Sequence, residues 1–163
     1  MKHNESQLQQ QCVAWFRAQY PQYAMLLTHV ANEGNGNHVT GAIHKAEGTV
    51  AGVPDLLLFM PASYEATEEE HDGKWFRFCG LGIEMKTATG KQSQQQKDYQ
   101  RMFEAAKYRY EIVRSLDEFR EVVNIHIRNC HPECRRMIAS AHVEIEKEKL
   151  ERERAKLQKI IKK

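Results

Sequence analysis

Apolar residues recur every three or four positions in three stretches of the chain, a spacing typical of amphipathic helices. The first stretch covers residues 4–20, where Asn4 is placed to cap the helix and a Tyr-Pro pair ends it. Ser93 opens the second stretch. Its expected buried stripe is Tyr99, Met102, Phe103, Ala106 and Tyr110. The third begins at Ser115 or Asp117 and continues to residue 125.

Shorter apolar runs between these helices predict β-strands. They cover residues 23–30, 56–60, 75–86 and 110–113, and the third run is divided near two glycines. Residues 31–38 form a Gly/Asn loop, residues 39–45 are expected to form a short helix, and the acidic residues 64–72 an exposed hairpin loop. The order of elements predicts a mixed α/β domain with helices flanking a central sheet.

The C-terminal part of the chain has a different pattern from the rest. From residue 142 it predicts a highly charged helix, in which Val143, Leu150 and Leu157 recur every seven residues. Lys147 and Arg154 fall where the apolar seam should be completed, so the coiled-coil signal is weak. We therefore predict a folded domain over residues 1–130 and a charged helical extension over residues 131–163.

Composition limits the class of protein more than it identifies it. A length of 163 residues with 41% hydrophobic and 28% charged residues suits one globular domain. No apolar run reaches the roughly 20 residues that cross a bilayer, and the N-terminus lacks the apolar segment of a secretory signal. Four cysteines are too few for a disulfide scaffold. These features predict a protein of the cytoplasm with no membrane partner.

Net charge is informative only when it is divided by segment. The chain total is +2, but residues 142–163 hold eight Lys/Arg against five Glu. The remainder holds 16 Lys/Arg against 17 Asp/Glu, and residues 64–72 contain five acids with no Lys or Arg. Charge alone therefore neither requires nor excludes a nucleic-acid partner.

The candidate chemistry lies in two short segments. Side chains alternate along a strand, so Glu84 and Lys86 share one face of the predicted strand over residues 75–86. Asp55 stands at the start of the run at 56–60 and can approach Glu84 if the two strands pair. Mg²⁺ uses one or two such carboxylates together with water and phosphate oxygens. Either segment alone is more often structural, with Asp55 as a strand cap and Glu84 with Lys86 as a solvated pair.

Taken together, the two segments resemble a known family pattern. Pro54-Asp55 followed by Glu84-x-Lys86 resembles the PD-(D/E)xK nucleases, and more narrowly the virus-type replication and repair nuclease (VRR-NUC) family, in its standalone phage and bacterial form. The resemblance covers about residues 4–125. It rests on Glu5, Asn32-Glu33-Gly34, residues 48–55, residues 82–86, Gly90, and Ser93 with Gln96. Lys107-Tyr108 departs from the Gly-Tyr pair expected after the second helix.

The resemblance implies a fold, a reaction and a set of site residues. The fold is a restriction-endonuclease-like α/β core, and the reaction is Mg²⁺-dependent hydrolysis of DNA, with Mn²⁺ as a substitute. The implied metal ligands are Glu5, Asp55, Glu84 and the Met85 carbonyl, and the implied catalytic residues are Asp55, Glu84, Lys86 and Gln96. The family further implies a homodimer that cuts four-way or other branched DNA in replication, recombination or repair, in a bacterial or phage-infected cell.

Several of these residues also have purely structural interpretations. Ser93-x-x-Gln96 is a capping box, and Glu5 is an acid of a kind common in the first turn of a helix. The expected DNA contacts are Asn32, Lys45, Lys91 and Ser93, each of which is otherwise a solvated loop or cap residue. The His and Cys residues between positions 126 and 142 do not have the spacing of common zinc sites, so we expect them to be structural.

The sequence leaves two alternatives to a junction nuclease. One is a flap or restriction-like nuclease on the same scaffold. The other is a DNA-binding or assembly module that does no chemistry and uses residues 132–163 to bind a partner protein.

Overall fold

The structure, a computed structural model, describes residues 2–30, 43–65 and 75–161. In chain order its elements are α1 (Lys2–Gln19), the 3₁₀ helix η1 (Pro21–Leu26), β1 (Leu27–His29), β2 (Leu56–Leu58), β3 (Ala62–Glu65), β4 (Trp75–Phe78), β5 (Leu81–Met85), α4 (Gln94–Ala105), β6 (Arg109–Val113), α5 (Leu116–Arg128) and α6 (Pro132–Ile161). The predicted mixed α/β class is confirmed.

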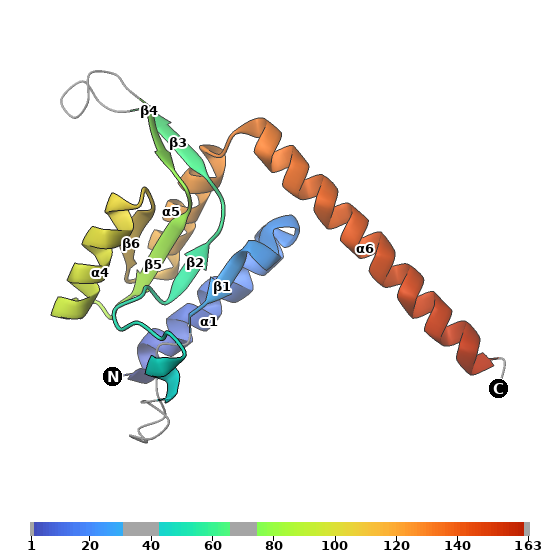
Figure 1. Cartoon of the computed structure of the whole chain (residues 1–163), viewed down its shortest axis with the longest axis horizontal. Coiled ribbons are helices and arrows are strands. Elements are labelled where there is room, and N and C mark those ends of the chain that lie inside the picture. The colour runs from blue at the N-terminus through green and yellow to red at the C-terminus, as the bar shows by residue number, and fades with distance from the viewer. Residues whose placement is uncertain (1, 31–42, 66–74, 162–163) are drawn as a thin grey trace.

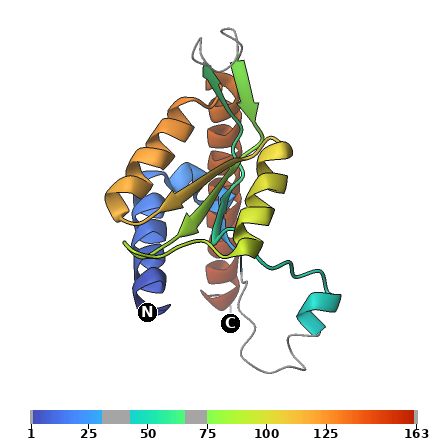
Figure 2. The same ribbon diagram turned by 90° about the vertical axis from the view of Figure 1, so that its left-hand side faces the viewer.

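A four-stranded mixed sheet lies at the centre of the fold, in the order β1-β2-β5-β6. The first three strands are antiparallel, and β6 is parallel to β5 because α4 connects them as a crossover. Helix α4 covers one face of the sheet, while α1 and α5 cover the other (Figures 1 and 2). Strands β3 and β4 form a separate antiparallel hairpin that extends beyond the sheet (Figure 1).

Strand β5 is buried along its whole length, which places it at the centre of the core. Its odd-numbered residues Ile83 and Met85 pack with α1 and α5, where Phe16 and Phe119 are fully buried. The even-numbered residues Gly82 and Glu84 therefore face the side covered by α4. A Cβ atom at Gly82 would lie 2.7 Å from the Phe103 ring, so this glycine lets α4 approach the sheet closely.

The predicted strand over residues 23–30 is largely wrong. Residues 21–26 form a 3₁₀ helix, and only Leu27–His29 pair with β2. Pro21 occupies the first turn of η1, and the buried Tyr23 stacks on Tyr20. A short apolar run does not distinguish a strand from a buried helical turn, and this packing decides for the turn.

The expected hairpin loop and short helix agree with the structure only in part. Tyr64, placed in the loop at 64–72, belongs to β3 together with the residues on either side of it. The run at 75–86 forms two strands in two sheets, separated near Gly80 as its glycines suggest. Residues 43–46 form a helical turn, and the rest of the short helix predicted at 39–45 lies outside the described residues.

Three expectations for the helices need correction. Met102 was expected in the core, but it is 72% exposed because the sheet beneath α4 leaves a groove at that position. Helix α6 begins at Pro132, within the helical extension predicted over residues 131–163 but ten residues before the charged helix expected from residue 142, and it extends away from the body (Figure 1). Helix α1 begins at Lys2, so Asn4 lies within the helix and does not cap it. In the described part of the chain, no helix is long and apolar enough to span a bilayer.

Lys107, which follows α4, has φ = 63°, a left-handed conformation in which a side chain is unfavourable. This is the position where the sequence departs from the expected Gly-Tyr pair. The helix therefore still ends in a turn that glycine would favour. The backbone carbonyl of Lys107 accepts a hydrogen bond from the N–H of Cys79 at 2.7 Å, which ties the turn to the end of β4.

His126 connects α5 to the start of the β3–β4 hairpin. It is fully buried, with Nε2 2.8 Å from the Met60 carbonyl and Nδ1 3.1 Å from the Tyr64 hydroxyl. Burial lowers the pKa of His126 to about 4, and the neighbouring Arg109 also lowers it, while the bond to Met60 raises it. His126 is therefore neutral at pH 7.

We expect the buried His126 to make stability depend on pH. Its pKa is lower in the folded chain than in the unfolded chain, so its contribution is complete above about pH 6.5 and is lost as the pH falls toward 4. The free energy of unfolding should fall by about 3 kcal/mol across this interval because of His126. Urea titrations at several pH values would measure this. His126→Gln should remove most of the slope, and the exposed control His131→Gln should not; equal slopes in both variants would contradict the prediction.

Candidate active site

Asp55 and Glu84 lie side by side across two paired strands. Leu56 pairs with Ile83, so the same antiparallel register places Asp55 opposite Glu84 on the face toward α4. Asp55 lies just before β2, and its Oδ2 accepts a hydrogen bond from the Met85 N–H at 2.7 Å, which holds the carboxylate against β5. The structure thus brings together the two carboxylates that the sequence placed on separate strands.

Glu84 and Lys86 form a buried ion pair at the end of β5. Lys86 Nζ lies 2.6 Å from Glu84 Oε1, and the two residues are 8% and 1% exposed. The interpretation of these residues as a solvated surface pair is therefore wrong. Burying two charges carries a large desolvation cost, so the pair is poor evidence for a purely stabilising role.

Two further side chains from other elements hold Glu84. Gln96, in the first turn of α4, donates through Nε2 to Glu84 Oε1, and the Tyr110 hydroxyl of β6 lies 3.3 Å from Glu84 Oε2. Gln96 Oε1 at the same time accepts the Ser93 N–H at 2.9 Å, and Ser93 Oγ accepts the Gln96 N–H at 3.2 Å. The predicted capping box therefore exists, and its glutamine also reaches the carboxylate pair.

Tyr110 is a site residue that no sequence pattern indicated. Its position at the end of an apolar stripe suggested core packing, but β6 pairs with β5 so that Tyr110 lies beside Gly82, on the carboxylate face. Burial is the main reason that the pKa of Tyr110 is raised, and the negative charge of Glu84 raises it further. The hydroxyl therefore keeps its proton and can donate a hydrogen bond to Glu84. Only the register of a long-range parallel pair could have revealed this.

His29 is the second missed residue. Its Nδ1 lies 3.0 Å from the Asp55 carbonyl oxygen and 2.7 Å from Nε2 of Gln9, so it joins β1 to the start of β2 and to α1. Burial raises the pKa of Asp55, and the nearby His29 offsets a small part of that rise. A lone exposed histidine at the end of a short strand gives no sequence signal of such a role.

Glu5 lies at the edge of the same cluster. Its Oε1 accepts the N–H of Thr87 at 3.0 Å, which fixes the start of α1 against the end of β5. The charge of Glu5 raises the pKa of Asp55, so the two carboxylates are close enough to repel each other. The first-turn interpretation of Glu5 is incomplete, because the side chain makes a tertiary contact.

The two central carboxylates are held in an environment that disfavours their charge. Burial is the largest cause of the raised pKa of both Asp55 and Glu84, and each of them also feels a neighbouring carboxylate. Lys86 lowers both pKa values, and the Met85 N–H lowers that of Asp55. A cation placed between the two carboxylates would offset their repulsion.

The donor set fits a hard divalent cation that keeps several water ligands. Among the residues that the structure describes, no three His, Cys, Asp or Glu side chains come together as a metal-binding group. Mg²⁺ usually needs only one or two carboxylates, which Asp55 and Glu84 provide. Ligation by Glu5 and by the Met85 carbonyl remains a prediction. The same result gives no zinc site among the described cysteines and histidines, and Cys130 is buried in the core.

Only some of the expected DNA contacts lie near the two carboxylates. Ser93 caps α4 next to the site, and the exposed Lys91 lies two residues before it. Lys45 is exposed in the helical turn at 43–46, which stands away from the sheet (Figure 2). Asn32 lies outside the described residues.

The fold and the site together define a mixed α/β protein in which Asp55 lies opposite the buried Glu84, next to the buried Lys86. A profile of the VRR-NUC domain matches residues 2–117, and the chain belongs to this nuclease family. A solved structure described as a VRR_NUC domain protein shares the fold, with a TM-score of 0.60 and 20% identity, over 78% of this chain and 90% of that one. A comparison with curated protein sequences gives no match.

Proposed function

We propose that the protein is a Mg²⁺-dependent endonuclease that hydrolyses DNA phosphodiester bonds, with Mn²⁺ able to substitute. The observation that supports this most directly is Asp55 placed opposite the buried Glu84, with Lys86 Nζ 2.6 Å from Glu84. A protein that used these residues only for stability would gain little from setting two mutually repelling acids side by side and burying one of them. Membership of a nuclease family agrees with this proposal.

Each residue has a role that follows from its place. Asp55 and Glu84 would hold the cation, which when bound polarises the phosphodiester and lowers the pKa of a water ligand. Lys86 presents its ammonium group beside them, where it orients the attacking water and stabilises negative charge that develops on the phosphate. Gln96 and Tyr110 fix the orientation of Glu84 through their hydrogen bonds.

The substrate and the biological role are argued from the family resemblance. We propose branched DNA, including four-way junctions, as the substrate, in replication, recombination or repair, and a restriction-endonuclease-like organisation of the core. Asn32, Lys45, Lys91 and Ser93 would contact phosphates, and the N-terminus of α4 would add a partial positive charge. A flap or restriction-like activity is the enzymatic alternative.

A comparison of DNA structures tests this function. The purified protein should cut a four-way junction and a flap faster than a plain duplex of the same sequence, in Mn²⁺ or Mg²⁺, and activity on the flap alone would favour the flap alternative. Chelation should stop all cutting, because it removes the cation that would polarise the phosphodiester and lower the pKa of the attacking water. Equal cutting of the three substrates would contradict the structural preference. Intact DNA in every metal would favour the binding or assembly module.

We also propose a homodimer, in which two sites related by a twofold axis cut symmetric substrates. Helix α6 exposes Val143, Leu150 and Leu157, which are 50%, 49% and 59% exposed and recur every seven residues. A long helix with such unpaired apolar residues is a candidate for self-association or for a protein partner.

Removal of residues 142–163 tests the part played by α6. The deletion spares Cys134 and Ile138, which pack against the core, so the body should remain folded. If α6 forms the dimer interface, light scattering should show that the mass falls from two chains to one. A truncated protein that remains dimeric would place the interface on the body.

A further inference from the structure

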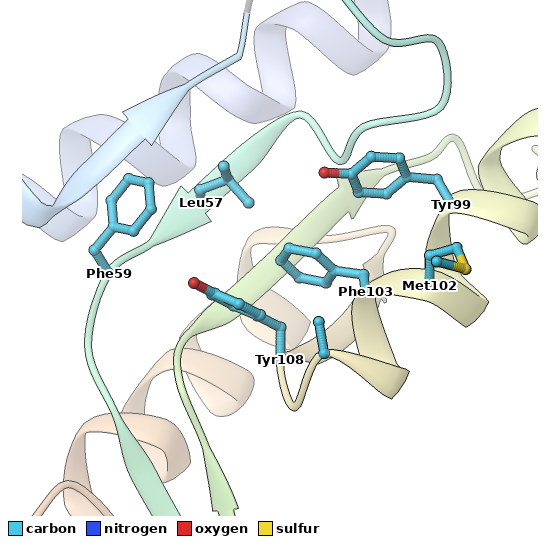
Figure 3. A pocket seen from close by; sticks show the side chains of 7 residues that line it. Leu57, Phe59, Tyr99, Met102, Phe103 and Tyr108 are labelled. Atoms are coloured by element: carbon cyan, nitrogen blue, oxygen red, sulfur yellow. The ribbon is translucent and has the colours of Figure 1, made fainter.

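We propose that an aromatic groove beside the carboxylate site binds one unpaired nucleobase of the DNA substrate; this proposal rests on the proposed nuclease function. The groove has a volume of about 350 Å³ and lies between β2 and α4 (Figure 3). It is lined by Leu57, Phe59, Tyr99, Met102, Phe103, Ala106 and Tyr108.

The groove lies on the same face of the sheet as the acid pair. Leu57 pairs with Gly82 and is two residues from Asp55, so side-chain alternation puts both on the side covered by α4. Two residues of strand span about 7 Å, and stacked nucleotides rise about 3.4 Å each. The floor of the groove therefore begins within about two nucleotides of a phosphate held at Asp55 and Glu84.

The walls of the groove are flat aromatic surfaces held in place by one another. The rings of Phe103 and Tyr108 stack with centroids 4.5 Å apart, and the Tyr99 ring lies 5.7 Å from that of Phe103. Figure 3 shows Tyr99 and Tyr108 directed across the groove toward β2, with their hydroxyl oxygens nearest the strand. A nucleobase needs both features, since it has a π face for stacking and a polar edge for hydrogen bonds.

The groove is open to solvent in the described chain. Phe59, at one side, is 50% exposed, and Met102, at the other, is 72% exposed. Seven lining residues provide far less than the ~800 Å² that each partner contributes to a stable protein interface. The size of the groove therefore favours a small planar group over a helix of another protein or a second copy of this chain.

The turn after α4 places one cationic side chain next to the groove. Lys107 is exposed and lies between Ala106 and Tyr108, both of which line the groove. On α4 itself the charges balance, with Lys97 and Arg101 against Asp98 and Glu104, and Arg101 Nη1 lies 3.7 Å from Asp98. A base in the groove would thus leave a phosphate near Lys107, as single-strand binding surfaces combine stacking rings with cationic side chains.

The groove gives a physical reason for a preference for branched DNA. A base in a perfect duplex must leave its stack and its pair before it can enter, which costs free energy. A base at a branch, a flap or a gap is already unpaired or less well stacked, so it enters the groove at a lower cost. The same groove would therefore strengthen binding to branched substrates and contribute little on a plain duplex.

The fluorescent base 2-aminopurine tests this proposal. It is placed at an unpaired position two nucleotides from the branch point of a DNA flap, and binding is measured in Ca²⁺ so that no cutting intervenes. The wild-type protein should quench its fluorescence. Phe59→Ala and Tyr108→Leu should weaken affinity for the flap roughly 5- to 100-fold and reduce the quenching, with unchanged affinity for a plain duplex.

Two variants and a control separate stacking from other effects. Tyr108→Leu keeps apolar bulk but removes a ring, and Phe59→Ala changes a half-exposed side chain, so it remains informative if Tyr108→Leu does not fold. Met137→Ala is the matched control, because Met137 on α6 is 68% exposed and lies outside the groove. It should bind the flap as the wild type does.

The outcomes distinguish failure of the groove from failure of the nuclease function. Unchanged flap affinity and quenching in Phe59→Ala would overturn the groove proposal even if the protein cuts DNA. Quenching that depends on Phe59, in a protein that cuts no DNA in Mn²⁺, would support the groove and reject the nuclease function. If Phe59→Ala instead dissociates a dimer in light scattering without changing DNA binding, the groove is a self-association surface and the proposal is wrong.

Discussion

Asp55→Asn is expected to lower the rate of DNA cutting about 1,000-fold or more while the protein remains folded. The amide keeps the shape of the side chain and can still accept the Met85 N–H, but it loses the charge that would hold the cation. Single-turnover cutting in Mn²⁺ measures the loss. DNA binding in Ca²⁺ should persist, because that binding depends on phosphate contacts elsewhere.

The same substitution should not reduce stability, which separates it from ordinary damage to the fold. Burial raises the pKa of Asp55, so the ionised form is less favourable in the folded chain than in the unfolded chain. Such a group favours folding below its unfolded pKa, and that contribution is lost as the pH rises through the folded pKa. At pH 7 the amide removes this penalty, and the free energy of unfolding should rise in Asp55→Asn.

Lys86→Met and Asp98→Asn complete the comparison. Lys86→Met should also abolish cutting, but it leaves Glu84 buried without its ammonium partner and should lower stability as well. Asp98, an exposed acid on α4, provides the matched control and should cut as the wild type does. Wild-type cutting by Asp55→Asn or by a folded Lys86→Met would remove that residue from the mechanism.

Gly52→Ala is expected to cost about 3 kcal/mol or more of the free energy of unfolding and to reduce cutting as well. Gly52 has φ = +90°, and a Cβ atom there would lie 2.6 Å from the Gln95 carbonyl carbon and 2.9 Å from the Gln96 nitrogen. Backbone atoms cannot move aside as a flexible side chain can, so the first turn of α4 would have to shift. That shift would move Gln96 away from Glu84.

Gly48→Ala provides a control that isolates the backbone cost from the steric clash. Gly48 also has a left-handed φ, of +97°, but a Cβ atom there would meet nothing within 4 Å. It should therefore cost only about 1 kcal/mol, the usual penalty for a side chain in this conformation. Urea unfolding of both variants measures the difference. Equal losses of stability would show that the loop around Gly52 can relax without displacing α4.

The parts of the site that the sequence predicted correctly depend on local spacing. Glu84 and Lys86 lie on one face because side chains alternate along any strand, and Ser93 and Gln96 form a capping box because three residues separate them at a helix start. The pairing of Asp55 with Glu84 required one further assumption, that the two strands were neighbours, and the register supports it.

The parts that the sequence did not reveal depend on contacts between distant segments. Tyr110 reaches Glu84 only because β6 pairs in parallel with β5 in one register, and His29 reaches Asp55 only because β1 lies beside β2. Met102 was misplaced for a related reason. Met102 falls at the spacing of the apolar stripe of α4, but the surface beneath that part of the helix is an open groove rather than a closed core.

The sequence by itself therefore determined the chemistry that the protein carries, as acids and a lysine at the ends of two apolar strands. Local periodicity is enough for that, because it depends only on the geometry of the backbone. The tertiary structure decided that Glu84 and Lys86 are buried as a pair, that Tyr110 and Gln96 hold the glutamate, and that an aromatic groove lies beside them. Burial and register arise from packing between distant segments, as in the contact of Glu5 with Thr87, 82 residues apart, and no local pattern encodes them.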